Sequence, residues 1–387
     1  MNHSKYILPV IIFSQFFCTS LWFAGNGIIQ DLVQTFNLEP SAIGHLTSAV
    51  QLGFIMGTFL FALLTITDRF SPSKVFCISA VIAAVFNLGM ILKNNNLLLL
   101  ITFRFFTGFF LAGIYPVGMK IAADYYEKGL GKSLGYLVGA LVVGTALPHL
   151  LNGFNGVFAW EMVVYITSGL AVFGGLIMFF FVPDGPYRKP ADGLDFSIVY
   201  KVFSEKKFRA AAIGYFGHMW ELYAFWAFTP LLLIGYQSVH SEMNFNISFL
   251  SFLIIASGGI ACIISGYLSS FLGTKSTATM ALTMSCICCL ISPLIFQQNS
   301  EILFISFMVF WGMAVIADSP LFSTLIAQNS KVTFRGTALT IVNSIGFAVT
   351  IISIQLMGML VDVIEVKFLF VFLAIGPMLG LINLFRK

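Results

Sequence analysis

The sequence predicts an all-α polytopic membrane protein with twelve transmembrane helices in two pseudo-symmetric six-helix bundles. Three observations support this fold class. The chain has 387 residues, of which 58% are hydrophobic and only 9% are charged, whereas a soluble domain carries about 25% charged residues. Its apolar residues gather in twelve runs, and motifs of the first half recur about 204 residues later. This composition excludes a soluble enzyme, a nucleic-acid-binding protein and a disordered chain.

Each apolar run is long enough to cross a membrane, which takes about 20 residues. We place the spans near residues 7–30, 43–66, 74–93, 98–121, 132–152, 161–183, 209–235, 248–271, 276–297, 301–325, 336–358 and 366–385. The first run continues without a small-residue cleavage site, so we expect it to remain as a span and not to act as a secretory signal. The six cysteines all lie within spans, where they fit small apolar packing positions better than disulfides or metal ligands. We expect no metal and no cofactor.

The only long polar stretch separates the sixth span from the seventh. It divides the chain into an N-terminal bundle (1–183), a cytoplasmic linker (184–208) with a short amphipathic helix near 195–205, and a C-terminal bundle (209–387). With the N-terminus inside, sixteen of the twenty Lys and Arg residues fall on the cytoplasmic side, and only Lys93 and Lys367 face outward. Because basic loops are retained in the cytoplasm, we expect a bacterial inner-membrane protein with both termini cytoplasmic.

The two halves repeat in the same orientation. Gly108 and Pro116 of the fourth span match Gly312 and Pro320 of the tenth, with an offset of 204 residues in both cases. The basic loop that begins at Asp68 has a weaker counterpart at residues 270–275. Two parallel six-helix repeats joined by a linker are the layout of transporters that rock around a central site.

On these residues the chain resembles the major facilitator superfamily over essentially its whole length. The loop signature of that family, Gly-x-x-x-Asp-Arg-x-Gly-Arg-Arg/Lys, is partly kept: Asp68 and Arg69 stand, while Leu64 and Ser71 replace the two glycines. The resemblance implies that Asp68 docks onto the start of the eleventh span when the inner side is closed. The alternative is that Asp68 and Arg69 only fix the topology.

The seventh and tenth spans resemble a bacterial branch loosely described as nitrate/nitrite or cyanate porter-like. Nitrate porters hold their anion with an Arg in the second span and another in the eighth. Residues 43–66 and 248–271 contain neither Arg nor Lys, which argues against nitrate as the solute.

Ionisable residues inside the spans are the main functional candidates, because charge near the bilayer centre is costly. Glu221 lies near the middle of the seventh span, with His218 one turn earlier on the same face, and Asp318 lies deep in the tenth. We assign these three residues to proton coupling. The alternative for Glu221 and His218 is a structural hydrogen-bond pair that locks the seventh span to a neighbour, and the alternative for Asp318 is a pair with a basic residue on the cytoplasmic side. Arg104 of the fourth span is the candidate anion ligand, and its alternative is an ion pair with Glu161 or Asp31.

Two further sets of residues complete the predicted site. The first contains candidates for solute contact: Arg104, Trp22, Asn26, Tyr115, Trp220, Tyr223, Trp311 and Asn343. The second contains candidates for gating: Asp68, Arg69, Lys120, Asp124 and Arg335. Lys120 and Asp124 are spaced i, i+4 and are expected to form a salt bridge with each other.

Together these observations predict a transporter and not an enzyme. We expect alternating access and proton-coupled uptake of a small organic solute, with an anion preferred. The alternatives are proton-driven efflux of drugs or metabolites, and porting of an inorganic anion such as nitrate or cyanate. The expected partners are the small-molecule solute, protons and the lipid bilayer, with no nucleic acid, and the expected state is a monomer.

Overall fold

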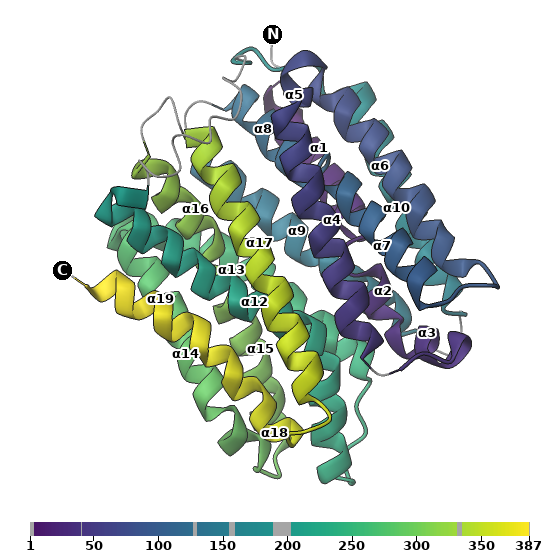
Figure 1. The fold of residues 1–387 in the computed structure, drawn as a ribbon. Coiled ribbons are helices and arrows are strands. Elements are labelled where there is room, and N and C mark those ends of the chain that lie inside the picture. The colour runs from purple at the N-terminus through teal and green to yellow at the C-terminus, as the bar shows by residue number, and fades with distance from the viewer. Residues whose placement is uncertain are drawn as a thin grey trace. The chain divides into compact units, whose positions relative to one another are not determined.

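The computed structural model describes residues 4–39, 41–126, 130–154, 159–188, 203–330 and 335–386. In these ranges every regular element is a helix, which confirms the all-α class (Figure 1). Contacts divide the chain into two compact units, Met1–Leu194 and Asp195–Lys387. The division falls within the segment predicted as the linker. Most of the amphipathic helix expected near residues 195–205 lies outside the described residues.

The first unit contains ten α-helices and one short 3-10 helix among its described residues. They are α1 (Ser4–Thr19), α2 (Ala24–Gly27), α3 (Ile29–Phe36), α4 (Ala42–Leu63), α5 (Ile66–Arg69), α6 (Pro72–Leu88), η1 (Gly89–Ile91), α7 (Leu97–Leu111), α8 (Tyr115–Tyr125), α9 (Leu130–Asn152) and α10 (Glu161–Phe181). Helix α7 begins where Asn96 interrupts the apolar run, and the Asn96 side chain accepts the backbone N–H of Leu99 at 2.9 Å.

The described residues of the second unit repeat this pattern of long and broken helices. They are α12 (Lys206–Val239), α13 (Ile247–Leu272), α14 (Thr274–Phe296), α15 (Glu301–Ala317), α16 (Ser319–Gln328), α17 (Arg335–Leu360), α18 (Val366–Leu369), η3 (Phe370–Ala374) and α19 (Ile375–Phe385). Asn246 caps the start of α13 by accepting the backbone N–H of Phe249 at 3.0 Å.

Eleven helical segments in the described ranges are long and apolar enough to cross a membrane. The first predicted span is the exception, because its continuous apolar helix covers only Tyr6–Thr19. The chain turns at residues 20–23 and then continues into α2. With this interrupted segment the count agrees with the twelve predicted spans.

Two other predicted spans are also built from two helices each. The fourth span breaks between Leu111 and Tyr115, and the tenth breaks at Asp318. Pro116 and Pro320 lie in the first turn of the helix that follows each break, where the missing N–H of proline leaves no helical hydrogen bond unmade. The same interruption therefore occurs at matching places in both units.

The internal repeat is visible in backbone packing as well as in sequence. Gly108 of α7 lies so close to α4 that a Cβ there would be 2.1 Å from the carbonyl oxygen of Val50. Gly312 of α15 lies equally close to α13, with a Cβ 2.1 Å from the carbonyl oxygen of Ile254. Both partners are related by the same offset of 204 residues. The repeated glycines thus allow the corresponding helix pair to pack closely in each unit.

Candidate functional site

Helix α12 carries two buried titratable side chains on one face. His218 and Glu221 lie one turn apart, and each is 1% exposed. Asp318, also 1% exposed, lies at the break between α15 and α16. The sequence predicts that His218 and Glu221 share a face but does not predict which residue faces them. The structure brings all three groups into the core of the second unit.

His218 and Asp318 form a buried pair, which is an ion pair when the imidazole is protonated. The Nδ1 atom of His218 lies 2.7 Å from Oδ1 of Asp318. The opposite nitrogen, Nε2 of His218, and the Oδ2 atom of Asp318 are buried and have no hydrogen-bond partner in the described part of the chain. These two atoms are therefore positions at which a proton or a polar group of a solute can bind.

Glu221 is held by donors from two other helices. Its Oε1 atom accepts from Ser285 Oγ at 2.5 Å and from Cys289 Sγ at 3.2 Å, both on α14, and from Trp311 Nε1 on α15 at 2.7 Å. No Lys, Arg or His nitrogen of the described residues lies within ion-pair distance of Glu221. Ionisable side chains inside membrane-spanning segments are rare and are found in substrate pathways, ion pathways and proton relays.

Ser285 and Cys289 are site residues that the sequence alone does not identify. Apolar packing is the role expected for Cys289, yet its thiol also donates to Glu221. The available signal is their i, i+4 spacing, which places both side chains on one face of a helix. That spacing does not reveal which charged group the face meets.

The first unit holds Arg104, which is fully buried. Its guanidinium donates to the carbonyl oxygen of Leu21 at 3.1 Å, to that of Trp22, and to Oδ1 of Asn87 at 3.2 Å. Leu21 and Trp22 lie in the break of the first span, where helical hydrogen bonding is interrupted. Arg104 therefore satisfies backbone acceptors that the break exposes. Within the described ranges it makes no ion pair, so neither Glu161 nor Asp31 is its partner.

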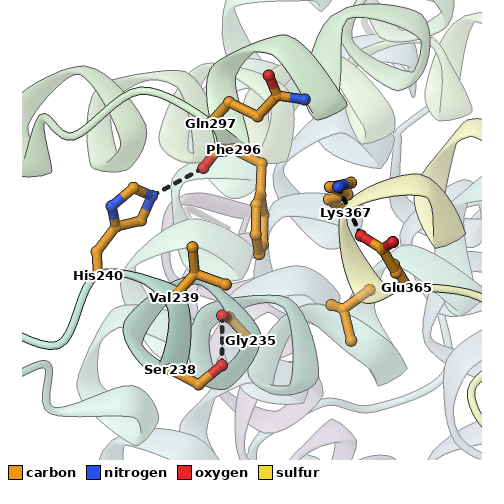
Figure 2. Close-up of a pocket in the computed structure, with 9 residues that line it drawn as sticks. Gly235, Ser238, Val239, His240, Phe296, Gln297, Glu365 and Lys367 are labelled. Atoms are coloured by element: carbon orange, nitrogen blue, oxygen red, sulfur yellow. Dashed lines mark hydrogen bonds and ion pairs between the residues drawn. The ribbon is translucent and has the colours of Figure 1, made fainter.

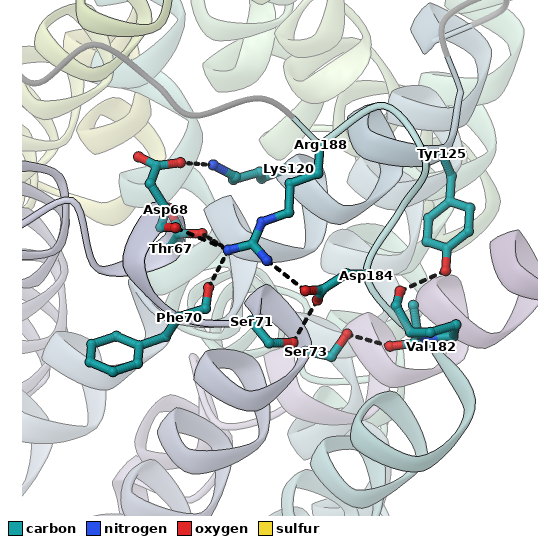
Figure 3. Close-up of polar contacts among 11 residues, drawn as sticks. Thr67, Asp68, Phe70, Ser71, Ser73, Lys120, Tyr125, Val182, Asp184 and Arg188 are labelled. Carbon is teal, nitrogen blue, oxygen red and sulfur yellow. Dashed lines mark hydrogen bonds and ion pairs between the residues drawn. The ribbon is translucent and has the colours of Figure 1, made fainter.

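Two of the predicted gating residues, Asp68 and Lys120, belong to a polar network at one end of the first unit (Figure 3). Lys120 pairs with Asp68. The predicted salt bridge between Lys120 and Asp124 is wrong, because the short helix α5, between α4 and α6, brings Asp68 to the lysine. Asp124 is buried instead, and its carbonyl oxygen accepts the backbone N–H of Tyr187 at 3.0 Å.

Arg188 and Asp184 also belong to this network, although their place after the sixth span indicates only a linker. Arg188 donates to the carbonyl oxygens of Asp68 at 3.0 Å and Phe70 at 2.8 Å, and to Asp184 at 2.5 Å (Figure 3). Arg69 Nε donates to Thr65 Oγ1 at 3.1 Å. The side chain of Arg335 lies outside the described residues.

The candidate solute contacts in the first unit lie around the break of the first span. The Trp22 ring meets that of Tyr115 edge-on, with centroids 6.4 Å apart. Asn26 donates to Thr47 Oγ1 at 2.7 Å.

The remaining candidates belong to the second unit. Trp311 is a hydrogen-bond donor to Glu221, whereas Trp220 Nε1 donates to the carbonyl oxygen of Phe372 at 3.2 Å and so joins α12 to η3. Tyr223 packs against Phe347 with ring centroids 5.4 Å apart. The Oδ1 atom of Asn343 is buried and has no hydrogen-bond partner among the described residues.

Uncharged polar residues are further candidates that were not predicted. The side chains of Gln15 on α1 and Gln51 on α4 are fully buried, and neither has a hydrogen-bond partner in the described part of the chain. Nε2 of His149 on α9 is also buried and has no hydrogen-bond partner among the described residues. The signal that could have found them is the occurrence of polar residues within apolar runs.

Comparison with known proteins agrees with this architecture. Residues 11–354 match the Major Facilitator Superfamily. No curated protein sequence matches the chain. Among solved structures, a point mutant of the nucleoside transporter NupG is similar at 14% identity, with a TM-score of 0.75 over 98% of this chain and 100% of that one.

Two other structures share the fold. The human organic anion transporter MFSD10 (TETRAN) gives a TM-score of 0.76 at 12% identity, over 99% of this chain and 100% of that one. A bacterial homologue of the human lysosomal transporter Spinster gives 0.69 at 14% identity, over 99% of this chain and 94% of that one. At these identities the likeness concerns the fold.

Proposed function

Since the chain belongs to the Major Facilitator Superfamily, we propose that it is a secondary active transporter that couples movement of a small organic solute to protons through Glu221, His218 and Asp318. The observation that carries the proposal is the buried His218–Asp318 pair, whose histidine lies one helical turn from Glu221. Three titratable groups in one membrane-embedded core have no simple packing role. They fit a relay that takes up and releases protons.

The hydrogen bonds of Glu221 suggest how a proton would act on the helices. The ionised carboxylate accepts from Ser285 on α14 and from Trp311 on α15, and so ties both helices to α12. Hydrogen bonds to an ionised group are roughly twice as strong as those between neutral groups. Protonation of Glu221 would weaken these ties and loosen the contact among the three helices.

The solute class is proposed from the remaining residues. The preference for an anion rests on Arg104, whose guanidinium binds the carbonyl oxygens of the first-span break. We therefore assign to Arg104 the role of stabilising the backbone at that break. We propose that the organic solute is bound by aromatic and amide side chains. Uptake into the cytoplasm is the preferred direction, and the excess of basic residues on one side supports an inner-membrane location with both termini inside.

A proteoliposome assay tests the proposal. The purified chain is reconstituted and screened against organic anions, nucleosides and amines, with nitrate and cyanate included, under an imposed proton gradient of either direction. Glu221→Gln is expected to abolish gradient-driven accumulation but to retain solute exchange at zero gradient, because the neutral amide mimics one protonation state. Glu301→Gln, an exposed change at the start of α15, is the matched control. Accumulation that is unaffected by the gradient, or unchanged in Glu221→Gln, would refute proton coupling.

A further inference from the structure

One end of the second unit holds a cavity that the transport site does not use. It has a volume of about 390 Å³ and lies where α12 and α14 end and α18 begins (Figure 2). Gly235 allows the close approach of α18 there, because a Cβ at this position would lie 2.8 Å from Cγ1 of Val366. Val239 and Phe296 supply further apolar lining. The cavity therefore has an apolar floor at the end of membrane-spanning helices.

Polar groups of both charges line the same cavity. Glu365 and Lys367 form an ion pair at 2.5 Å on one side, and His240 lies on the other side, with Phe296 and Val239 between them (Figure 2). The Nε2 atom of His240 lies 3.0 Å from the carbonyl oxygen of Phe296. The C-terminal ends of α12 and α14 also meet here, and their carbonyl groups carry partial negative charge. The cavity thus offers an acidic group and helix ends to a cation, and a lysine to an anion.

A second, apolar hollow is lined by α14, η3 and α19, so that α14 is the helix it shares with the cavity. It has a volume of about 280 Å³ and is lined by Leu290 of α14 together with Val371, Ile375 and Met378. Leu290 of α14 lines the hollow, and Gln297, which directly follows the end of α14 seven residues later, lines the cavity, so both lie on one side of this helix. Leu290, Ile375 and Met378 are 43–48% exposed, as expected for side chains that face hydrocarbon.

We propose that the cavity and the hollow together bind one membrane phospholipid with a zwitterionic primary-amine headgroup, such as phosphatidylethanolamine. The ammonium would lie at Glu365 and the helix ends, the phosphate at Lys367, and an acyl chain in the hollow beside Leu290. The charge pair, the apolar hollow on the same side of α14 and the position of the cavity at the ends of the helices match such a lipid. The site is separate from Glu221, so the proposal stands independently of proton coupling.

Native mass spectrometry of the purified full chain in detergent tests the assignment. The protein is titrated with phosphatidylethanolamine, phosphatidylcholine and phosphatidylglycerol of equal chain length. We expect the primary amine to bind most tightly, and Glu365→Gln or Lys367→Gln to weaken it about two- to fivefold, the range for a partly exposed ion pair. Lys93→Gln, which changes an exposed lysine of the first unit, should leave binding unchanged. Equal binding of the three lipids, or wild-type binding by both variants, would overturn the proposal.

Two further arms distinguish a lipid site from a site for a free headgroup. Leu290→Trp should block the hollow and weaken phosphatidylethanolamine binding while the thermal unfolding midpoint is kept. Soluble glycerophosphoethanolamine should compete poorly; if it binds as tightly as the lipid, the site recognises a free headgroup and the lipid assignment fails. The exchanged pair Glu365→Lys/Lys367→Glu keeps an ion pair but reverses its sides, and wild-type lipid binding by this variant would contradict the proposed orientation.

Discussion

The His218–Asp318 pair makes a quantitative prediction about stability. At the 2.7 Å separation of Nδ1 and Oδ1, the attraction between full charges is about 6 kcal/mol for an effective dielectric constant of 20. Desolvation of two ions takes up several kcal/mol each, so the intact pair contributes little net stability. Removing one partner is different, because it leaves the other group buried and unpaired. His218→Leu strands the Asp318 carboxylate and is expected to lower the free energy of unfolding by about 3–5 kcal/mol.

A double-mutant cycle isolates the interaction. Asp318→Asn leaves an imidazole that can stay neutral, so its expected loss is smaller, about 1–3 kcal/mol. The double variant His218→Leu/Asp318→Asn carries no stranded charge and should lose about 2 kcal/mol less than the sum of the single changes. Denaturant unfolding in detergent, monitored by tryptophan fluorescence, gives the free energy of unfolding of the wild type, the two single variants and the double variant. Losses that add within about 0.5 kcal/mol would refute the coupling inferred from the geometry.

Three other predictions follow from contacts outside that pair. Arg104→Ala should lower the free energy of unfolding by about 2–4 kcal/mol, since it removes charged hydrogen bonds to the first-span break. Arg104→Lys should restore only part of this free energy, because an ammonium group lacks the forked donors of the guanidinium. Full rescue by lysine in the same unfolding assay would contradict this role. Gly312→Ala places a Cβ 2.1 Å from the carbonyl oxygen of Ile254 and should lower stability by about 1–3 kcal/mol, while Gly358→Ala, with nothing within 4 Å, should be neutral or stabilising. Burial raises the pKa of Asp31, which follows the first predicted span, so the folded state favours its protonated form. Stability therefore falls as the pH rises from the ordinary pKa of an aspartate through the raised pKa. Asp31→Asn should raise the thermal unfolding midpoint near pH 7 but not near pH 4, and an equal shift at both pH values would count against this explanation.

The fold was predictable because its signals are local. Hydropathy located the spans, and the glycine and proline pattern revealed the repeat. Both signals lie within single segments, because the residues of a helix reflect whether it faces lipid, protein or water. The pairing of side chains was less accessible. Lys120 and Asp124 satisfy the i, i+4 rule, yet Asp68, 52 residues away, takes the lysine. Residue spacing along one helix does not show that another segment, here the short helix α5, contacts that helix.

The candidate site shows the same limit. Glu221, His218 and Asp318 could be identified from the sequence because charge in an apolar run needs an explanation. Their partners could not, because Ser285 and Cys289 are ordinary residues whose role depends on which helix faces α12. The break in the first span contains no proline, so no residue type marks its position in the sequence. The hydrogen bonds of Arg104 to this break could therefore not be predicted.

The matching helix breaks of the fourth and tenth spans differ in one residue that matters. The residue before the second helix is Ile114 in the first unit and Asp318 in the second, 204 positions apart. The same interruption occurs in both units, but a titratable group occupies this position only in the second. The two breaks therefore differ in polarity: the first unit has an aliphatic side chain at this position, and the second has a carboxyl group that is paired with His218. Ile114→Asp, which places an acid at the first break, would show whether that break tolerates a buried carboxyl group without a partner such as His218.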